Sequence, residues 1–282
     1  MKSVLITGGT GTLGNGIVKR LLQEDTCRRI CIYSRGEKQQ AEMAGRFSDA
    51  RLRFFIGDVR DYMRLRRAMD GCEVVIHAAA LKRVEVGVQN PGEMKRTNID
   101  GSENVVETAR DLGIKKAVLV STDKAYAPLE TNPYGLSKAY AERFFIAANA
   151  HHRPSHPAYS VVRYGNVWQS AGSVVPMWRA ILASGGRPVI TDPNCTRFFM
   201  LLSEAVDFVL GAVKKMNGGE IFVPNLPAYE LGILAYAMGL NDKSLWKIIG
   251  LPNYEKLHES MEDGKCSKDA RRMSVEELKS FL

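Results

Sequence analysis

The feature that most constrains the fold of this chain is a glycine-rich turn close to its start. Residues 7–14, with the sequence TGGTGTLG, follow a short apolar run and precede a helical pattern. The glycines at positions 8, 11 and 14 are spaced to allow a tight turn, a close approach to pyrophosphate and close helix–strand packing. Because such a turn presents free backbone N–H groups to phosphate, it predicts a dinucleotide site.

The first 165 residues predict an α/β fold with a Rossmann-like, doubly wound parallel sheet. Short apolar runs alternate with helical patterns, which is typical of parallel strands joined by crossover helices. We expect strands at residues 3–7, 29–34, 52–56, 74–77, 117–121 and 159–163, and helices at residues 13–24, 61–69, 95–112 and 134–150. Later segments are less regular. We therefore expect a dinucleotide-binding domain over residues 1–165 and a smaller, mostly helical substrate lobe over residues 166–282, intertwined with it.

Composition and charge exclude several other classes of protein. The formal net charge is +8, but the 39 Lys and Arg residues are interspersed with 31 Asp and Glu residues. No basic stripe interleaved with aromatic residues occurs, so we expect no nucleic-acid partner and attribute the excess charge to an anionic small substrate. No apolar run approaches the roughly 20 residues that span a bilayer. Without a signal-peptide pattern either, we expect no membrane contact and a cytoplasmic location. The five cysteines are scattered and lack zinc-site spacing, so we expect free thiols and no metal.

The type of dinucleotide is indicated at the end of the second strand. An NAD enzyme usually places an acid there for the ribose 2′-hydroxyl, whereas this chain has Arg35, whose guanidinium suits a 2′-phosphate. This favours NADP, with Lys38 assisting, and leaves NAD as the alternative. Asp58 is placed to accept from the adenine amino group. The full set of expected contacts is Gly8, Thr10, Gly11, Thr12, Leu13, Gly14, Ser34, Arg35, Lys38, Asp58, Val59, Ala78, Ala79, Ala80, Lys82, Tyr134 and Lys138.

A second group of residues predicts redox chemistry at a hydroxyl. Tyr134 and Lys138 are four residues apart at the start of a predicted helix, so they share one face. A neighbouring ammonium lowers the pKa of a phenol, which makes Tyr134 a candidate base. Thr122, at the end of the fifth strand, is placed to hydrogen-bond the same hydroxyl.

Together these motifs resemble the extended short-chain dehydrogenase/reductases and, more narrowly, the inverting UDP-N-acetylglucosamine 4,6-dehydratases. The similar segments extend over almost the whole chain. They are residues 56–61 (IGDVRD), 77–82 (HAAALK), 121–125 (STDKA), 162–167 (VRYGNV), 172–176 (GSVVP), 196–198 (TRF), 218–224 (GGEIFVP) and 255–259 (EKLHE). The Thr-Asp-Lys triplet is the most informative, because the retaining dehydratases carry an acidic residue at its third position.

The resemblance implies an enzyme that recycles NADP within each turnover. Tyr134 would assist oxidation at C4 while hydride is held on the cofactor. Lys124 would remove the C5 proton, and Asp123 would protonate the departing 6-hydroxyl before hydride returns to C6 and C5 is reprotonated on the opposite face. The implied catalytic set is Thr122, Asp123, Lys124, Tyr134 and Lys138.

The resemblance also implies a UDP-sugar site and a homo-oligomer, a dimer or larger. The residues expected to line that site are Lys82, Asn166, Val174, Arg197 and Glu259. Arg197 suits the diphosphate, and Glu259 suits the uridine ribose. Asn98 is expected to fix the sheet and the active-site backbone rather than to touch substrate.

Three departures from the family pattern leave alternatives open. Residues 125–133 form a loop about two residues longer than usual, Trp168-Gln169 replaces an expected Gly-Ser, and Arg83 replaces a histidine. They put the sugar and the C5 outcome in question. A dehydratase that stops at a 5,6-ene, a UDP-sugar 4-epimerase and a dinucleotide-binding protein without turnover are the alternatives.

Overall fold

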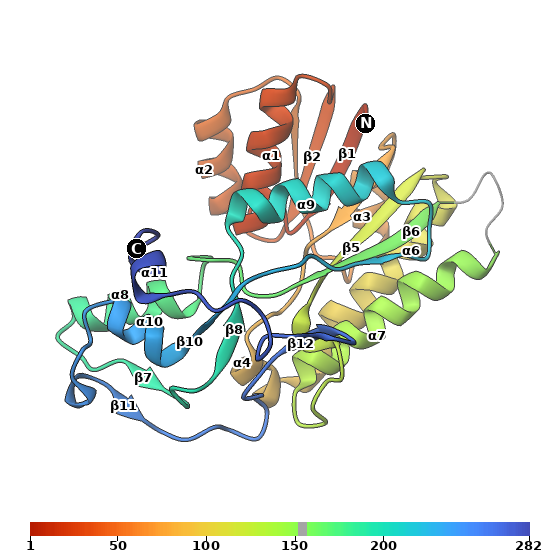
Figure 1. The fold of residues 1–282 in the computed structure, drawn as a ribbon. Coiled ribbons are helices and arrows are strands. Elements are labelled where there is room, and N and C mark those ends of the chain that lie inside the picture. Colours follow the sequence, from red (N-terminus) through yellow and green to blue (C-terminus); the bar gives the residue numbers. More distant parts are fainter. Residues whose placement is uncertain (152–156) are drawn as a thin grey trace.

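The computed structural model describes residues 1–151 and 157–282, and its centre is a seven-stranded sheet (Figure 1). Every strand pair in this sheet is parallel. The strand order is β3 (Leu52–Ile56), β2 (Arg29–Ser34), β1 (Ser3–Thr7), β4 (Val74–His77), β5 (Lys116–Thr122), β6 (Ala158–Tyr164) and β9 (Ile221–Phe222). The six predicted strands are confirmed, with β5 and β6 one residue longer at each end. The expected Rossmann-like fold is therefore present.

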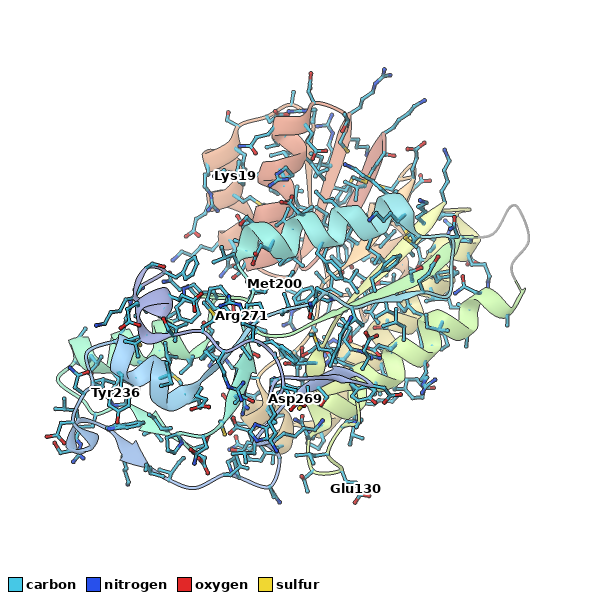
Figure 2. All side chains as sticks on the ribbon, viewed as in Figure 1. Lys19, Glu130, Met200, Tyr236, Asp269 and Arg271 are labelled. Atoms are coloured by element: carbon cyan, nitrogen blue, oxygen red, sulfur yellow. The ribbon has the colours of Figure 1, made fainter. Side chains whose placement is uncertain are left out.

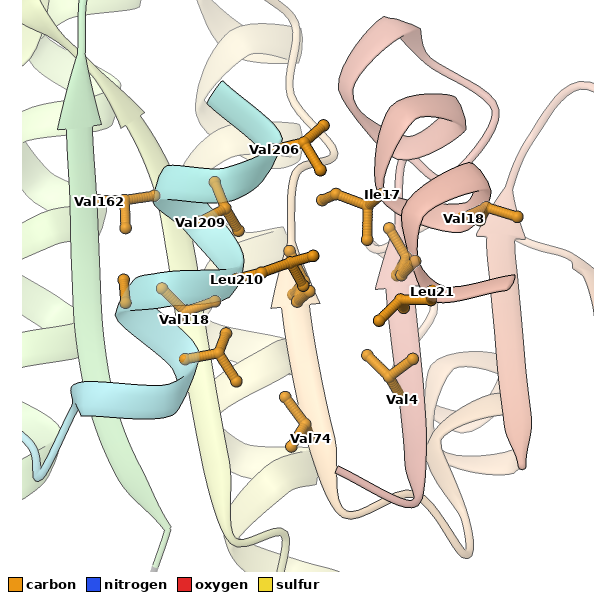
Figure 3. Packing of buried hydrophobic residues seen from close by; sticks show 14 of the residues in the cluster. Val4, Ile17, Val18, Leu21, Val74, Val118, Val162, Val206, Val209 and Leu210 are labelled. Carbon is orange, nitrogen blue, oxygen red and sulfur yellow. The ribbon is translucent and has the colours of Figure 1, made fainter. Parts of the chain in front are cut away.

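Helices cover both faces of the sheet. Neighbouring residues of each strand point to opposite sides, so each face has its own apolar core. In β1, Val4 and Ile6 pack into one core cluster and Leu5 into another. The first cluster lies under α1 (Thr12–Glu24), α2 (Glu37–Phe47) and α9 (Leu202–Lys215). The second lies under α3 (Tyr62–Met69), α6 (Gly101–Asp111) and α7 (Pro133–Ala147). Figure 3 shows side chains of α1 and α9 meeting over the strands of the first face.

Two helical regions differ from the expectation. Helix α2 was not predicted, because Glu37–Phe47 is rich in Glu, Gln and Lys and buries only two side chains, Gln40 and Met43. The helix expected at residues 95–112 is split into α5 (Pro91–Lys95), a π-helical turn (Arg96–Asp100) and α6, and a short α4 (Val84–Gln89) precedes it. Such π-turns are frequent at functional sites.

The second half of the chain builds a lobe beside the carboxyl edge of the sheet (Figure 1). Its helices are α8 (Val174–Ala183), α10 (Leu231–Ala237) and α11 (Val275–Lys279). Three two-stranded sheets accompany them: β7 (Val189–Ile190) with β11 (Lys247–Ile248), β8 (Thr196–Phe198) with β10 (Ala228–Glu230), and β12 (Ser260–Glu262) with β13 (Lys265–Cys266). Between β8 and β10 the chain returns to the main sheet and contributes α9 and β9. The chain thus passes between the sheet and the lobe more than once, and the division at residue 165 stays a prediction.

The part of the chain that the structure describes contains neither a membrane-spanning helix nor a metal-binding cluster. None of the helices there has the length and apolar character needed to cross a membrane. No group of three His, Cys, Asp or Glu side chains in residues 1–151 and 157–282 is arranged to hold a metal ion. All five cysteines are free thiols, and four of them are buried.

Candidate active site

The glycine turn after β1 is packed so closely that side chains are excluded from it. Gly8 has a φ of +66°, and a Cβ there would lie 2.8 Å from the backbone nitrogen of Ala79. A Cβ on Gly14 would lie 2.3 Å from the carbonyl oxygen of Gly9. The Gly8 N–H donates to the Tyr33 carbonyl at 2.8 Å, which ties the turn to β2. The three glycines therefore set the backbone path, as their spacing predicted.

The N-terminus of α1 is open to an anion. Its N-cap is Gly11, which supplies no side-chain hydrogen bond, and its first turn carries no acidic residue. Free N–H groups and the positive end of the helix dipole therefore face the same point. The Asn15 amide donates to the Thr10 carbonyl at 2.8 Å and holds the turn in shape. These features fit the pyrophosphate of a nicotinamide dinucleotide.

The end of β2 presents the basic residues expected at the cofactor's 2′-position. The Arg35 side chain is 56% exposed and lies 3.8 Å from Oδ2 of Asp58, and Lys38 is still more exposed beside Glu42. Asp58 is bound more tightly by Arg60, with N···O distances of 2.7 and 3.0 Å. Burial opposes the charged form of Asp58, but Arg60 and Arg35 outweigh it and lower its pKa. Arg35 thus stays available to a ligand while Arg60 holds the carboxylate.

Two other expected cofactor contacts are engaged within the protein. The Ser34 hydroxyl accepts from the Gln40 amide at 3.0 Å, and the same amide donates to the Phe55 carbonyl at 2.9 Å. The Val59 side chain is buried in the core, so that only its backbone can face a ligand. Gln40 links the ends of β2 and β3, and sequence reasoning missed it because a lone glutamine in a helix gives no signal.

Asn98 joins the loop after β4 to α7, as predicted. Its side chain accepts from the Leu81 N–H at 2.8 Å and donates to the Leu81 carbonyl at 2.9 Å. It also donates to the Ser137 hydroxyl at 3.0 Å. Since Leu81 follows the Ala78–Ala80 segment, this buried amide fixes the backbone on which the cofactor is expected to lie.

The residues expected to be catalytic come from the end of β5 and the start of α7. A single 3-10 turn (Asp123–Ala125) follows β5, and α7 packs against it. A Cβ on Gly135 would lie 2.5 Å from the Lys124 carbonyl oxygen, so a glycine is required for this close contact. The Asn132 side chain accepts from the Gly135 N–H at 2.9 Å and caps the helix. This contact brings Tyr134 to Thr122 and the Asp-Lys pair.

The Lys124 ammonium lies between two buried carboxylates. Its Nζ is 3.2 Å from Oδ1 of Asp123 and 3.3 Å from Oε1 of Glu259. The Thr122 hydroxyl donates to the same oxygen of Asp123 at 2.9 Å. Burial works against the charged form of Lys124, but the two carboxylates outweigh it and hold its pKa above the ordinary value. The amine is therefore protonated in the resting chain.

Tyr134 also holds its proton in the resting chain. Burial raises its pKa to about 12, although the charge of Lys124 and the Thr122 hydroxyl act in the opposite direction. From the sequence we expected Lys138 to lower the pKa of Tyr134. In the structure, Lys124 is the cation that lowers it. Burial lowers the pKa of Lys138 itself to about 8, against the opposing charge of Glu142.

Glu142 is the second residue that sequence reasoning missed. Its carboxylate accepts from the Ser121 hydroxyl at 2.5 Å and from Nε of Arg163 at 3.0 Å. It is buried on the face of α7 that carries Tyr134 and Lys138. The spacing of four residues from Lys138 was a visible signal, because it continues the same face by one more turn.

The placement of Glu259 does not fit the role expected of it. We expected contact with the uridine ribose, but Glu259 is only 1% exposed and its carboxylate pairs with Lys124. Arg197, expected at the diphosphate, is likewise buried and forms an ion pair with Glu255. It also donates to the carbonyls of Thr196 and Leu257 at 2.8 and 3.2 Å. Arg197 is thus buried near Lys124 and Glu259, with donors already engaged by protein groups.

The long loop between Lys124 and α7 packs against residues 253–256, which lie in the same segment as Glu255 and Glu259. Thr131 Oγ1 donates to the Asn253 carbonyl at 2.6 Å, and the Asn132 amide donates to the Tyr254 carbonyl at 3.0 Å. In return, Lys256 donates to the Tyr126 carbonyl at 2.9 Å. Figure 2 shows Glu130 at the outer end of the loop, away from the site. The loop therefore attaches residues 253–256 to the catalytic turn.

Of the Trp168-Gln169 departure, Trp168 lies in the lobe core, whereas Gln169 is exposed. The Trp168 ring packs against Phe199 and Tyr229, with centroid distances of 4.9 and 5.8 Å. Its backbone N–H donates to the Met200 carbonyl at 2.7 Å, where the chain leaves the lobe for α9 (Figure 2). Trp168 and Gln169 both donate to the Phe281 carbonyl. This pair thus fastens residue 281 to the lobe.

The remaining expected substrate contacts lie in or beside residues 166–174, the loop between β6 and α8. Lys82 Nζ donates to the Ala171 carbonyl at 2.9 Å, and the Ala171 N–H donates to Thr12 Oγ1 at 3.3 Å. Asn166 and Val174, before and after this stretch, are half-buried. Residues 166–174 thus lie between the glycine turn and the lobe, where a ligand that contacts both parts would bind.

Fold and site together define a Rossmann-like enzyme of the short-chain dehydrogenase/reductase class, with the adjacent Asp123 and Lys124 beside its Thr and Tyr. The chain belongs to the polysaccharide biosynthesis protein family, whose model matches residues 4–277. It is 45% identical over 261 residues to the UDP-N-acetylglucosamine 4,6-dehydratase (inverting) of Campylobacter jejuni strain 81-176. It is 40% identical over 265 residues to the UDP-glucose 4-epimerase of Rickettsia massiliae. Each alignment covers 92% of this chain and 77% of the relative.

Solved structures give the same assignment of the fold. Pen from Bacillus thuringiensis superimposes with a TM-score of 0.92 at 32% identity, covering 99% of this chain and 97% of that one. The dTDP-glucose 4,6-dehydratase DesIV from Streptomyces venezuelae, solved with NAD bound, gives a TM-score of 0.83 at 23% identity, covering 99% and 95%. The latter likeness supports the fold alone.

Proposed function

We propose that the chain is an NADP-dependent UDP-N-acetylglucosamine 4,6-dehydratase that inverts C5 and yields a UDP-4-keto-6-deoxy sugar. The observation that carries this proposal is the pairing of Asp123 with Lys124 at 3.2 Å, directly beside Thr122 and Tyr134. A dehydrogenase or an epimerase needs only the set of Thr122, Tyr134 and Lys138. The adjacent acid and amine supply the two extra proton transfers that loss of water requires.

Each residue of the cluster has a role that its position supports. Tyr134, with Thr122, accepts the proton of the C4 hydroxyl, and a bound dinucleotide supplies the reversible redox step there. Lys124 takes the C5 proton, which the neighbouring ketone has made acidic, and Asp123 protonates the departing 6-hydroxyl. Because Tyr134 and Lys124 both hold protons at rest, we expect the rate to rise with pH through the neutral range.

The proposal includes NADP rather than NAD. Arg35 is exposed at the end of β2, and Asp58 beside it is already neutralised by Arg60. A 2′-phosphate would therefore meet a free guanidinium rather than a free carboxylate. The homo-oligomer and the cytoplasmic location stay predictions.

A 4-epimerase is the second candidate, because relatives at 40% identity carry that name. The two activities share Tyr134 and the dinucleotide site, and they differ in the use of Asp123 and Lys124. A dehydratase product that stops at a 5,6-ene is a third outcome, in which water leaves, hydride returns to C4 instead of C6, and no proton returns to C5.

Mass spectrometry separates epimerisation from loss of water, and NMR separates the 4-keto-6-deoxy sugar from its 5,6-ene isomer of equal mass. The purified chain, supplied with UDP-N-acetylglucosamine and NADP, should release a nucleotide sugar lighter by one water, with a 4-keto group. An unchanged mass with a galacto-configured sugar would mean epimerisation instead.

The variant Lys124→Ala tests the assignment of the base. We expect dehydration to fall by about 10³-fold, within the range for loss of a general acid or base. The control Lys19→Ala removes an exposed lysine on α1 (Figure 2) and should retain the wild-type rate. Unaltered product formation by Lys124→Ala would remove the amine from the mechanism.

A further inference from the structure

Glu259 reaches the catalytic cluster from a distant part of the sequence. It precedes β12, which packs against the 3-10 turn holding Asp123 and Lys124. Its Oε1 lies 3.3 Å from Lys124 Nζ, a distance nearly equal to the 3.2 Å on the Asp123 side. The amine is thus held from two directions.

The backbone of Glu259 is fixed independently of this ion pair. Its N–H donates to the Ser267 hydroxyl at 2.9 Å, and its carbonyl accepts from the Ser267 N–H at 2.7 Å. The Ser267 hydroxyl also bonds Thr196 Oγ1 at 2.6 Å, which links the hairpin to β8. The carboxylate is therefore delivered to Lys124 by a rigid support.

The ion pair leaves two carboxylate oxygens unused. Oδ2 of Asp123 and Oε2 of Glu259 are buried and have no hydrogen-bond partner among the described residues. Leaving such atoms unpaired is costly, and an ion pair kept for stability alone would bind them. The two carboxylates are better explained as groups that hold the Lys124 amine in place.

The other charged and titratable groups around the cluster are few. Arg197 lies close enough to act on both Lys124 and Glu259, but its guanidinium is bound to Glu255. The hydroxyls of Tyr134 and Tyr229 face the cluster and are held protonated by burial, which raises the pKa of each to about 12. Lys256 acts weakly on Glu259.

We propose that Glu259 is a positioning residue that holds the Lys124 amine in line with Asp123 and Tyr134 and strengthens it as a base. The inference rests on the proposed function only for the use that it gives to Lys124. The nearby negative charges raise the pKa of Lys124 despite its burial, and Glu259 is the second of them after Asp123. A stronger base removes a carbon-bound proton faster once it is free.

The reactivity of Lys124 measures this effect without any turnover. Only the neutral amine reacts with acetic anhydride, and peptide mass spectrometry reports its acetylation against Lys19 in the same sample. Removal of an opposite charge at this distance lowers a pKa by about one to three units. In Glu259→Gln, we therefore expect Lys124 to be acetylated about tenfold faster or more at pH 8 than in the wild type.

Two further variants separate charge from structure. Glu259→Asp keeps the charge and should stay within about threefold of the wild-type acetylation rate. Glu262→Gln, on the same hairpin but paired with Lys265, should match the wild type. If Glu259→Gln leaves the rate unchanged, or if Glu259→Asp is as fast as Glu259→Gln, the proposal is overturned, because the charge would then have no influence on the amine.

Turnover gives the second test. Loss of Glu259 enlarges the neutral fraction of the amine but releases it from its alignment with Asp123 and Tyr134, and we expect the lost alignment to dominate. Glu259→Gln should therefore lower kcat at least tenfold with little change in KM, move the rise of rate with pH to lower pH, and be partly rescued by Glu259→Asp. An increase in KM alone would instead support the uridine-ribose role. If the wild type does not dehydrate its substrate, the proposed function fails, while the acetylation result still decides the role of Glu259.

Discussion

The dinucleotide edge and the acid/base cluster share the carboxyl end of one sheet but are built differently. At the glycine turn the backbone forms the site: Gly8 and Gly14 touch neighbouring main chain so closely that no Cβ fits. In the cluster, side-chain charges form the site: Lys124 lies between Asp123 and Glu259, and Arg197 lies beside them. The turn is contained in eight consecutive residues, whereas the cluster joins segments more than 130 positions apart.

This difference predicts how each part responds to change. A backbone-made site is sensitive to added volume and insensitive to pH. A charge-made site tolerates volume changes better, but its protonation depends on every neighbour. Substitutions in the two parts should therefore differ in kind and in size.

Gly14→Ala should have the largest effect. Its methyl group would lie 2.3 Å from the Gly9 carbonyl oxygen, so the turn must shift. We expect a loss of about 3 kcal/mol in the free energy of unfolding, together with loss of dinucleotide binding. Urea unfolding and a fluorescence titration with NADPH measure both.

Gly45→Ala is the matched control for that change. Gly45 lies in α2, and a Cβ there meets nothing within 4 Å. Helix propensity predicts a gain of about 0.5–1 kcal/mol. If the two variants were equally stable, close packing at the glycine turn would not be what requires Gly14.

Lys138→Met should stabilise the chain while it removes activity. Burial lowers the pKa of Lys138 to about 8 from 10.5, so folding at neutral pH keeps a charged amine in an unfavourable place. The cost is full below pH 8 and disappears as pH rises to about 10.5, since the unfolded state then holds the extra proton. We expect a gain of about 3 kcal/mol at pH 7 that shrinks above pH 8.

Urea unfolding of Lys138→Met at several pH values tests this sign. The exposed Lys19→Met serves as the control and should show no such pH dependence. A gain that is equal at pH 7 and pH 10.5 would mean that better packing, and not the buried charge, causes the stabilisation.

Arg35→Ala should change cofactor preference without touching the cluster. Loss of a charge-assisted hydrogen bond costs about 1.5–3 kcal/mol, so we expect NADP to bind at least tenfold more weakly and NAD to be little affected. Calorimetric titration with each dinucleotide measures the ratio. Equal weakening of both would place Arg35 away from the 2′-phosphate.

Asn132→Ala should have the smallest effect of the four. It removes the cap of α7 and the bond to the Tyr254 carbonyl, and an N-cap contributes about 1 kcal/mol. Thermal unfolding gives the cost. A fall in kcat beyond what this small loss explains would show that the long loop positions Tyr134 as well as stabilising the helix.

The sequence was sufficient for the parts whose signals are local. The alternation of strands with helices and the glycine spacing both concern neighbouring residues, and the structure places each strand as predicted. Glu259 was misplaced because an ion pair across 135 positions has no local pattern. Helix α2 was missed for a related reason: it buries only two side chains and therefore shows little apolar periodicity.

The most direct test of the proposed chemistry is an NMR analysis of the product formed from UDP-N-acetylglucosamine in D₂O. If Lys124 removes the C5 proton and solvent returns one to the opposite face, the product is a 4-keto-6-deoxy sugar with deuterium at C5 and inverted configuration there. A product that keeps its 6-hydroxyl, or that retains the C5 configuration, would contradict the roles given to Asp123 and Lys124.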